Sequence, residues 1–484
     1  MIEIPKLPNE IRASLPLVVQ AYIAALEALE AVVAELQSQI EALQAQISEL
    51  QALTRQNSGN SSRPPSSDPP ATPPRPKRKP SGRKQGGQPG HERHVRPLLP
   101  SDEVDEIVDH HPEQCPQCHA RLAADLPAAK AFERQQVWDI PPVKPTVTEH
   151  RYHSVECPGC HSLVAGQRPA DVPPGAFGPA VIALVGLLHG RYRLSMRETE
   201  ALLADVFQLP ISTGGVSAVC QVVSASLATA YTDSHRRVSA AKAANVDETG
   251  WKQVRKKLWL WVAVTAEATV FRLADRSAKA LKALLGESYT GITTSDRFKS
   301  YGALPLERRQ SCWAHLKRNW QAFSERDGPV GAWGQKGITQ IESLFEVWHQ
   351  YKDGALARAA LRTEMQAVQN ALHELLEQGR GLPLKKAQTF CRDLLALWPT
   401  LWKFLEVEGI EPTNNAAERA LRPAVLWRKG CFGTQSEAGN YFVIRILTVV
   451  ATCRQQKRHV LTFLTDAVKA YIAGQPTPAL FSTP

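Results

Sequence analysis

The stretch AANVDETGWKQ, residues 243–253, opens the part of the chain that decides the fold. It passes from apolar residues to an acidic tip at Asp247. The runs KLWLWVAVT (257–265) and ATVFRLAD (268–275) follow it, with turn-like residues between them. Short runs rich in β-branched and aromatic residues, separated by turns, predict strands. We therefore expect three consecutive strands, with Asp247 at the end of the first.

A helix and a fourth strand are expected next. SAKALKALLG (277–286) has helical character, and GITTSDRF (291–298) predicts a strand that ends at Asp296. Three strands, a helix and a fourth strand are the opening of an RNase H-like α/β domain. Pairing of adjacent strands would bring Asp247 and Asp296 together. Two aspartates alone are weak evidence for a site, because acidic residues commonly end strands for solvation.

A third carboxylate lies in TNNAAERALR, residues 413–422. Thr413 or Asn414 is a suitable helix N-cap. A helix that starts there places Asn414, Glu418 and Arg422 on one face. On a plain surface helix, Glu418 and Arg422 would be an exposed pair worth at most about 0.5 kcal/mol.

The functional alternative is a metal site built from Asp247, Asp296 and Glu418. Phosphoryl transfer on DNA can use two divalent ions roughly 3.5–4 Å apart. Carboxylate oxygens are the protein ligands that Mg²⁺ prefers. On this hypothesis, Glu418 projects toward the two aspartates, while Asn414, Asn415, Arg419 and Arg422 orient it or hold the DNA backbone.

The charge balance points to a polyanionic partner. The 484 residues include 57 Lys and Arg against 47 Asp and Glu, a net charge of +10, and 43% hydrophobic residues suffice for several cores. Residues 51–96 hold ten basic and two acidic residues, so eight of the ten net charges lie in a segment rich in Pro, Ser and Gly. Such a tether would hold DNA without reading its sequence, or would only be a solvated linker. The candidate DNA contacts in it are Lys77, Arg78, Lys79, Arg83 and Lys84.

Residues 22–50 follow a heptad pattern with two apolar positions. One is occupied by Leu26, Val33, Ile40 and Ile47, and the other by Leu29, Leu36, Leu43 and Leu50. Mostly β-branched residues at one position and leucine at the other favour a parallel two-stranded coiled coil, and hence a homodimer. The alternative is one amphipathic helix that packs on its own protein.

Two C-x-x-C pairs predict a metal site: Cys115-Pro-Gln-Cys118 and Cys157-Pro-Gly-Cys160. Four thiolates in paired turns fit one closed, structural zinc ion without a catalytic role. Redox dithiols are the alternative, although they usually occur singly beside a βαβ unit. Between the pairs, AFERQQVWDI (131–140) and TVTEHRYHSV (146–155) look like short strands.

The stretch from Ser195 to Leu227 is typical of two helices. Ser195 and Glu198 form a capping box, and a second helix is expected to open at Ser212 or Thr213 after a QLP break. This resembles a helix-turn-helix. The second helix is poor in Arg and Lys, so plain helical packing is at least as well supported.

The localisation is expected to be cytoplasmic, with no membrane partner. The first ten residues, MIEIPKLPNE, do not have the pattern of a signal peptide. The longest apolar runs, such as AVIALVGLL (180–188), are too short to cross a bilayer. Nine cysteines, four of them in C-x-x-C pairs, indicate metal in a reducing compartment.

The ordered set of motifs resembles the TnpC-type transposases of the IS66 family of bacterial insertion sequences. The zipper, the basic linker with GGQPGH and the zinc knuckles come first, followed by VDETGW, SDRFKSYG, CWAHLKR and NNAAERALRP. The resemblance covers nearly the whole chain. It implies a DDE transposase whose triad falls on Asp247, Asp296 and Glu418. Such enzymes use water to nick transposon ends and then a 3′-hydroxyl to attack target DNA, with two Mg²⁺ (or Mn²⁺) ions and no covalent enzyme intermediate.

The resemblance also accounts for the long separation between Asp296 and Glu418, because the family is thought to carry a helical insertion there. The expected architecture is multidomain α/β: coiled coil 1–55, linker 56–100, zinc-binding domain 101–172, helix-turn-helix-like DNA-binding segment 173–240, RNase H-like domain 241–324, all-helical insertion 325–405, and second RNase H-like part with C-terminal helices 406–484. The expected partners are inverted-repeat ends, target DNA and possible accessory proteins of the same element.

Several residues near these motifs are weaker candidates. Cys312 and His315 stand at C-x-x-H spacing, as in many DDE enzymes, and we expect a strand–helix junction that supports the active site with His315. A zinc ligand pair is the alternative. Four tryptophans favour core packing over base stacking: Trp333, Trp348, Trp398 and Trp402. Candidate phosphate contacts are Lys317, Arg318, Arg428 and Lys429, the last two in WRKGCFGTQSEAG (427–439), which resembles the family's C-terminal signature.

The function expected from the sequence is therefore metal-dependent cleavage of insertion-sequence ends and strand transfer into target DNA. Two alternatives remain: a nuclease of the same fold that only hydrolyses DNA, and a catalytically inactive zinc and coiled-coil DNA-binding protein.

Overall fold

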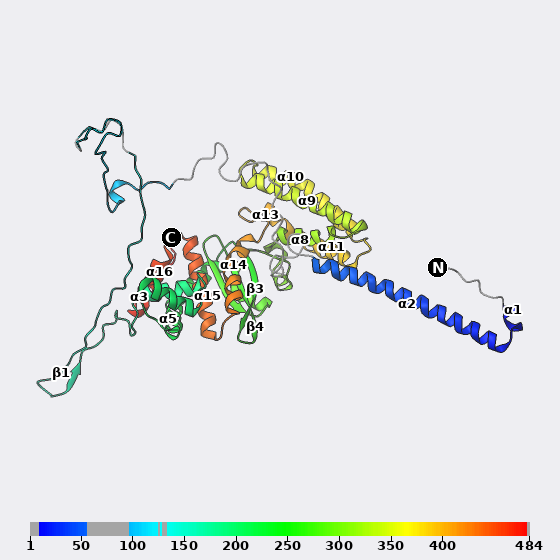
Figure 1. Cartoon of the computed structure of the whole chain (residues 1–484), viewed down its shortest axis with the longest axis horizontal. Helices are drawn as coiled ribbons and strands as arrows, with labels where there is room; N and C mark the ends of the chain where they lie inside the picture. The colour runs from blue at the N-terminus through cyan, green and yellow to red at the C-terminus, as the bar shows by residue number, and fades with distance from the viewer. Residues whose placement is uncertain (1–8, 56–95, 124–125, 128–132, 482–484) are drawn as a thin grey trace. The chain divides into compact units, whose positions relative to one another are not determined.

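Five strands form one mixed sheet, in the order β5-β4-β3-β6-β7. The computed structural model describes residues 9–55, 96–123, 126–127 and 133–481 (Figure 1). Strands β3 and β6 are parallel, β6 and β7 are parallel, and β4 and β5 are antiparallel. The strands are β3 (Ala243–Gln253), β4 (Lys256–Val264), β5 (Thr269–Ala274), β6 (Ile292–Ser295) and β7 (Arg309–Ser311). The four expected strands are confirmed. The three residues of β7 are too few to give a sequence pattern.

Strand β3 is longer than expected, so Asp247 does not end it. The strand continues to Gln253 because its second half is also held in place. Trp251 is 1% exposed, and its indole nitrogen donates a hydrogen bond to Thr434 Oγ1 at 3.3 Å. Thr434 also bridges to Gln253, far away in the sequence. The sequence predicted that the strand ends at Asp247, but this tertiary anchoring keeps the following residues extended.

The described residues divide into two compact units that share β3. The first contains residues 9–55, 242–246 and 290–416. The second contains residues 96–123, 126–127, 133–241, 247–289 and 417–481. The aspartate of β3 therefore follows directly after a segment of the first unit.

The second unit is built from helices around β4 and β5. Helix α5 (Thr213–Ser226) begins at the Ser212 cap, as predicted, and α4 (Met196–Phe207) has the predicted capping box. The inward side of α5 is apolar and buried, with Val216, Val219 and Val223 at most 6% exposed. Helix α5 packs against α3, α15 and α16, which supports packing as its main role. The other helices are α3 (Pro179–Gly190), α6 (Ala228–Ser239), α7 (Ala278–Leu285), α14 (Asn415–Cys431), α15 (Glu437–Gln455) and α16 (Val460–Ile472).

Helix α15 covers the backbone of β5. Thr448 Oγ1 accepts a hydrogen bond from the backbone N–H of Phe271 at 2.9 Å. Thr452 Oγ1 accepts from Thr269 N at 3.2 Å and donates to Thr269 O at 3.1 Å. An uncovered edge strand would present unpaired backbone groups, so these two threonines cap that edge of the sheet.

The strand at the other edge, β7, is covered within the first unit. Gln310 is 1% exposed, and its side-chain oxygen accepts from Phe404 N at 2.9 Å while its amide donates to Leu401 O at 3.2 Å. The Ser311 and Thr400 hydroxyls are 2.7 Å apart. These contacts join β7 to the short helices α12 (Trp398–Leu401) and α13 (Lys403–Glu406).

The rest of the first unit is helical and packs around aromatic side chains. The Trp320 and Trp333 rings lie 4.3 Å apart between centroids. Trp333, Trp348 and Trp402 are at most 8% exposed and Trp398 packs against the same core, so the expectation of core packing is confirmed. The helices, prominent in Figure 1 as α9 and α10, are α8 (Trp313–Ser324), α9 (Gly328–Lys352), α10 (Arg358–Gly379) and α11 (Lys385–Ala396). The turns η3 (Lys299–Ala303) and η4 (Leu306–Arg308) lie between β6 and β7.

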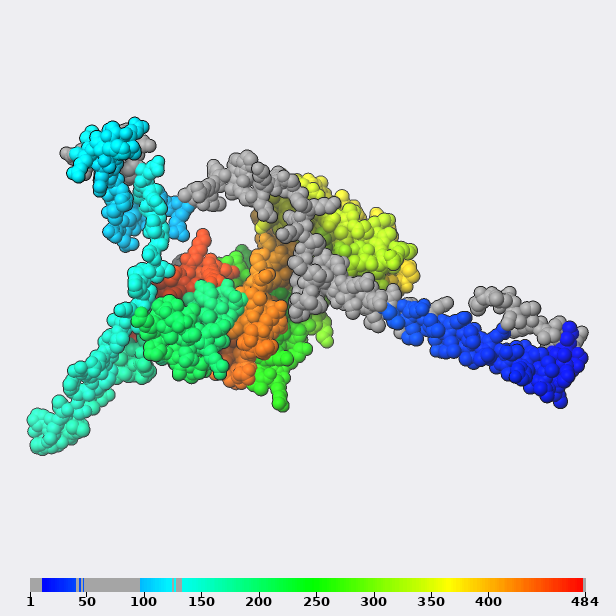
Figure 2. All heavy atoms as spheres, viewed as in Figure 1, coloured from blue at the N-terminus to red at the C-terminus, as the bar shows by residue number. Residues whose placement is uncertain are grey.

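The N-terminal helix α2 (Leu17–Arg55) is a single 39-residue helix, after the short α1 (Asn9–Ser14). Its heptad side chains from Leu26 to Ile47 are 45–58% exposed, and the side chain of Leu50 lies outside the described residues. The helix is drawn in blue in Figure 2. By length and composition alone, Leu17–Ile40 could also cross a membrane. The expectation that apolar runs are too short missed this stretch, because single polar residues interrupt it.

The cysteine-rich segment contains little regular structure. Its hairpin consists of β1 (Ser154–Glu156) and β2 (Leu163–Ala165), and a 3-10 turn, η2, spans Ser101–Glu103. Residues 133–153 form neither helix nor strand, so the strands expected in 131–140 and in most of 146–155 were wrong. Apolar side chains such as Val137 and Val147 are more than 80% exposed, so they have no core to pack against.

Candidate active site

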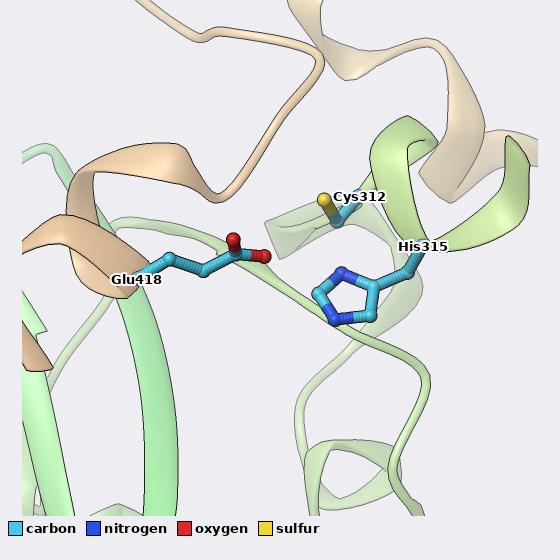
Figure 3. A group of neighbouring side chains, drawn as sticks. All are labelled: Cys312, His315 and Glu418. Carbon is cyan, nitrogen blue, oxygen red and sulfur yellow. The ribbon is translucent and has the colours of Figure 1, made fainter. Parts of the chain in front are cut away.

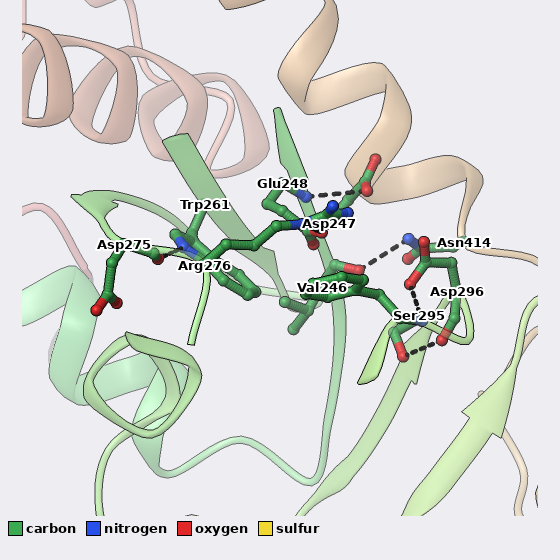
Figure 4. A network of polar contacts seen from close by, with 10 residues as sticks. Val246, Asp247, Glu248, Trp261, Asp275, Arg276, Ser295, Asp296 and Asn414 are labelled. Carbon is green, nitrogen blue, oxygen red and sulfur yellow. Dashed lines mark hydrogen bonds and ion pairs between the residues drawn. The ribbon is translucent and has the colours of Figure 1, made fainter. Parts of the chain in front are cut away.

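Asp296 directly follows β6, as the sequence predicted. Its Oδ1 accepts a hydrogen bond from Phe298 N at 2.8 Å, and its backbone oxygen accepts from Ser295 Oγ at 2.9 Å (Figure 4). Both bonds fix the direction of the aspartate at the end of the strand. Burial lowers the pKa of Arg309 on β7, and the negative charge of Asp296 opposes this shift. Asp296 thus stands in a positive electrostatic setting.

Asp247 lies in β3 beside a second acidic residue, Glu248. The backbone N–H of Glu248 donates to Asp247 Oδ1 at 2.9 Å (Figure 4). The Glu248 side chain is 1% exposed and accepts two hydrogen bonds from Arg276, at 2.6 and 2.8 Å. Arg276 in turn lies over the Trp259 ring at 4.1 Å. The pairing of Glu248 with Arg276 was not predicted, because nothing in the sequence spacing connects them.

The register of β3 and β6 relates the positions of the two aspartates. Asn245 is in register with Thr294 in the parallel pair. Asp247 and Asp296 each come two residues after these partners.

Asn414 is the residue that connects this region to α14. It is fully buried, and its side-chain amide donates to the Val246 carbonyl at 2.8 Å (Figure 4). Its backbone N–H points at Cys312 Sγ, 3.2 Å away. Val246 immediately precedes Asp247, and Glu418 follows Asn414 by one helical turn. The sequence predicted Asn414 as a cap, but it could not reveal this long-range bond.

Helix α14 begins at Asn415, as predicted, with Glu418 in its first turn. Glu418 is half-buried, whereas Ala417 and Leu421 are at most 3% exposed. The apolar side of the helix is thereby buried. The remaining predicted residues of its first turns, Asn415, Arg419 and Arg422, are exposed.

Cys312 and His315 come from the start of α8, at the predicted strand–helix junction (Figure 3, which also draws Glu418). Cys312 is 1% exposed, and its backbone N–H donates to Ser295 O at 2.9 Å. The next residue, Trp313, donates its backbone N–H to Pro412 O at 2.9 Å. The start of α8 therefore joins the end of β6 to the segment that leads into α14.

The predicted phosphate contacts have different environments. Lys317 forms an ion pair with Glu342 at 2.9 Å, and Arg428 donates to the carbonyl of Gly250. Arg318 is half-buried and Lys429 is exposed. Arg428 thus has a structural partner at the far end of β3. The linker residues Lys77, Arg78, Lys79, Arg83 and Lys84 lie outside the described residues.

The two cysteine pairs form nearly identical turns. His119 N donates to Cys115 O and His161 N donates to Cys157 O, both at 2.9 Å. Both histidines have a left-handed backbone, with φ of 59° and 56°. Each turn faces its two sulfurs toward one another. Hydrogen bonds, first from the Cys118 backbone, lower the pKa of Cys115, and bonds first from the Ser162 hydroxyl lower the pKa of Cys160.

Lowered thiol pKa values favour the thiolate form that binds metal. The four thiolates, one pair on each turn, are the donor set of a structural zinc site. Each pair therefore fits half of such a site.

Comparisons with known proteins assign much of the chain. Residues 174–441 match the family model described as Transposase IS66 family. Residues 112–161 match the zinc-finger binding domain of transposase IS66, and residues 14–97 match a family of unknown function.

Two curated relatives come from Sinorhizobium fredii. Uncharacterized protein y4qI is 26% identical over 247 residues, which cover 46% of this chain and 45% of the relative. Uncharacterized protein y4hP is 26% identical over 214 residues, 40% of this chain and 39% of the relative. The alignments span less than half the length of these relatives.

Proposed function

Since this chain belongs to the IS66 family of transposases, we propose that it cuts the ends of an insertion sequence and joins them to target DNA. The family match covers more than half of the chain and includes all three candidate carboxylates. Double-stranded DNA is then the substrate. The net charge of +10 is consistent with such a partner.

We assign the catalytic triad to Asp247, Asp296 and Glu418. The observation that carries this assignment is the bond from the buried Asn414 amide to Val246 O, next to Asp247 and one turn before Glu418. The β3–β6 register adds Asp296, because both aspartates follow paired residues by two positions. Asp247 therefore directly follows one end of this bond in the chain, and Glu418 follows the other end by four residues.

Three carboxylates fit divalent magnesium or manganese by the chemistry of the donor set, since hard oxygen ligands suit these ions. Two such ions would activate the attacking oxygen and stabilise the leaving oxygen. Hydrogen bonds from the chain itself would orient the carboxylates. The Phe298 N–H holds Asp296 Oδ1, and Asn414 fixes the approach of α14. Exposed Arg419 and Arg422 would pair with phosphates of the DNA.

We also propose an RNase H-like catalytic domain with a helical insertion. The order β5-β4-β3-β6-β7, with parallel β3, β6 and β7, supports the first part. Five helices between Gly328 and Glu406 support the second. The paired turns at Cys115, Cys118, Cys157 and Cys160 would share one structural zinc ion, and α2 would form the dimer.

Strand transfer with defined DNA tests the proposal. Pre-cleaved transposon ends are incubated with plasmid and Mg²⁺, and joined products are measured on gels. Glu418→Gln and Asp296→Asn should each lower cleavage and joining by about a hundred- to a thousandfold, because each removes a ligand that acts on charge in the transition state. Glu408→Gln, at an exposed glutamate before α14, is the matched control.

Three results would contradict parts of this proposal. Hydrolysis without joined product would identify a nuclease of the same fold. Cleavage that survives Glu418→Gln unchanged would remove Glu418 from the triad. A chain that binds DNA and zinc but neither cuts nor joins would be an inactive binding protein.

A further inference from the structure

A basic pocket lies beside Asp296 in the first unit and has no role in the triad. Its volume is about 260 Å³, and it opens between α8 and α11. Three cations line it: Arg297, Arg326 and Lys386. Asp393 is the one acidic residue in the lining, so the pocket has a net charge of two positive units. A second hollow of about 470 Å³ shares Arg297 and Asp393.

Arg297 is held rigidly in this pocket. Its guanidinium donates to Asn319 Oδ1 at 2.9 Å and lies over the Phe390 ring at 5.1 Å. Phe390 is 7% exposed and packs edge-on against Trp320, with ring centroids 5.6 Å apart. Burial lowers the pKa of Arg297, while Asp393 and Asp296 oppose the shift. An arginine remains charged under these conditions, so a fixed positive charge faces the pocket.

The side chains that line the pocket indicate which kind of ligand it would bind. Planar guanidinium groups bind phosphate with good geometry, and flanking flexible cations at the rim strengthen the attraction. A stacked base would need a free aromatic face, but Arg297 covers the face of Phe390. The pocket therefore fits a phosphate group better than a base.

We propose that this pocket binds a backbone phosphate of the DNA strand that enters the active site. Arg297 directly follows Asp296, so a phosphate held here would lie next to Asp296, one of the three proposed metal ligands. The helical insertion then has a role as a clamp on the substrate. This inference rests on the proposed function, because the proposed function is what identifies the bound polyanion as DNA.

Salt-dependent binding of a fluorescein-labelled random-sequence duplex to the full chain tests the pocket. The double variant Arg326→Gln/Lys386→Gln removes two exposed cations at its rim. Loss of the one phosphate contact reduces the slope of log affinity against log salt by about 0.9. Between about 50 and 200 mM salt, the variant should therefore lose roughly 3.5-fold less affinity than the native chain.

The matched control is Arg380→Gln/Lys385→Gln, which removes two exposed cations nearby that do not line the pocket. Its slope should equal that of the native chain. Equal slopes for the two double variants would overturn the proposal. Loss of inorganic phosphate binding by the pocket variant, with duplex binding like the control, would also overturn it, since a small free phosphate would be the occupant.

Asp296→Asn separates the two hypotheses. It should lower cleavage by about a hundred- to a thousandfold and keep the native salt slope. A native chain that fails to cleave, with a pocket variant that still shows the reduced slope, contradicts the transposase proposal and supports the pocket. A native chain that cleaves and joins, with equal slopes for both double variants, contradicts the pocket alone.

Discussion

At the scale of single residues, the buried side-chain amide of Asn414 links the start of α14 to β3. Asn414 has no solvent exposure and uses its side-chain N–H groups on Val246 O. Its neighbour Asn415 is exposed at the first position of α14. The sequence pattern does not distinguish Asn414 from Asn415, but Asn414 makes the long-range hydrogen bond to Val246 O.

Replacing Asn414 by Ala should therefore lower the free energy of unfolding by about 1–3 kcal/mol, because the Val246 carbonyl would be left buried without its donor. Asn415→Ala should change it by less than about 0.5 kcal/mol. Urea denaturation followed by tryptophan fluorescence measures both. Equal effects of the two substitutions would contradict the role given to the Asn414 bond.

At the scale of helices, α8 and α9 approach closely because Gly337 has no side chain. A Cβ at Gly337 would lie 2.0 Å from the Trp320 ring. Gly337→Ala should therefore destabilise the protein by about 1–3 kcal/mol through overpacking. Gly430→Ala in α14 meets no atom within 4 Å and serves as the control, with an expected gain of about 0.5 kcal/mol. A neutral Gly337→Ala in thermal unfolding would contradict this account of the helix contact.

Helix α2 makes a prediction about assembly. Its exposed heptad side chains form an apolar stripe, which usually marks an interaction surface. Leu36→Lys places a charge on this stripe, whereas Ser38→Lys places it on the outer side of the helix. Sedimentation should show a dimer for the native chain and for Ser38→Lys, and a monomer for Leu36→Lys. A monomeric native chain, or native association only with lipid vesicles, would contradict the coiled coil.

At the scale of the whole molecule, zinc content gives an independent measurement. One zinc ion per chain is expected from atomic emission, and Cys118→Ser or Cys160→Ser should remove it. Cys220→Ala, at a buried cysteine in α5, should retain it. Chelation should leave the far-ultraviolet helix signal almost unchanged, because the cysteine-rich segment contains no α-helix in its described residues. Zinc that persists in both serine variants would contradict the four-cysteine site.

Much of the order of elements could be predicted from the sequence, because most of the strands and helices have a local pattern. The capping box at Ser195 and the start of α14 followed from side chains a few residues apart. The continuation of β3 beyond Asp247 and the strand β7 could not be predicted. Both depend on partners distant in the chain: Thr434 for β3 and the segment around Leu401 for β7.

The candidate site shows the same limit. The candidate carboxylates could be proposed from sequence motifs. The Asn414–Val246 bond and the Glu248–Arg276 pair could not, because their partners are 168 and 28 positions apart in the chain. Between residues 133 and 153, where side chains are exposed, the sequence led to strands being predicted that the structure does not contain. Their composition favours strands, yet the described part of that segment has no neighbouring strand to pair with.

The threonines that cover β5 and the glutamine that covers β7 also restrict how copies of this protein can associate. Thr448 and Thr452 bond to backbone groups of β5, and β7 is buried against α12 and α13, so neither edge is open for a second chain to extend the sheet. Higher-order complexes on DNA would therefore have to form through side-chain surfaces of helices. Growth into strand-linked polymers is blocked while α15 stays docked on β5, and a Thr448→Val/Thr452→Val chain would leave the backbone N–H groups of Phe271 and Thr269 without these hydrogen-bond partners.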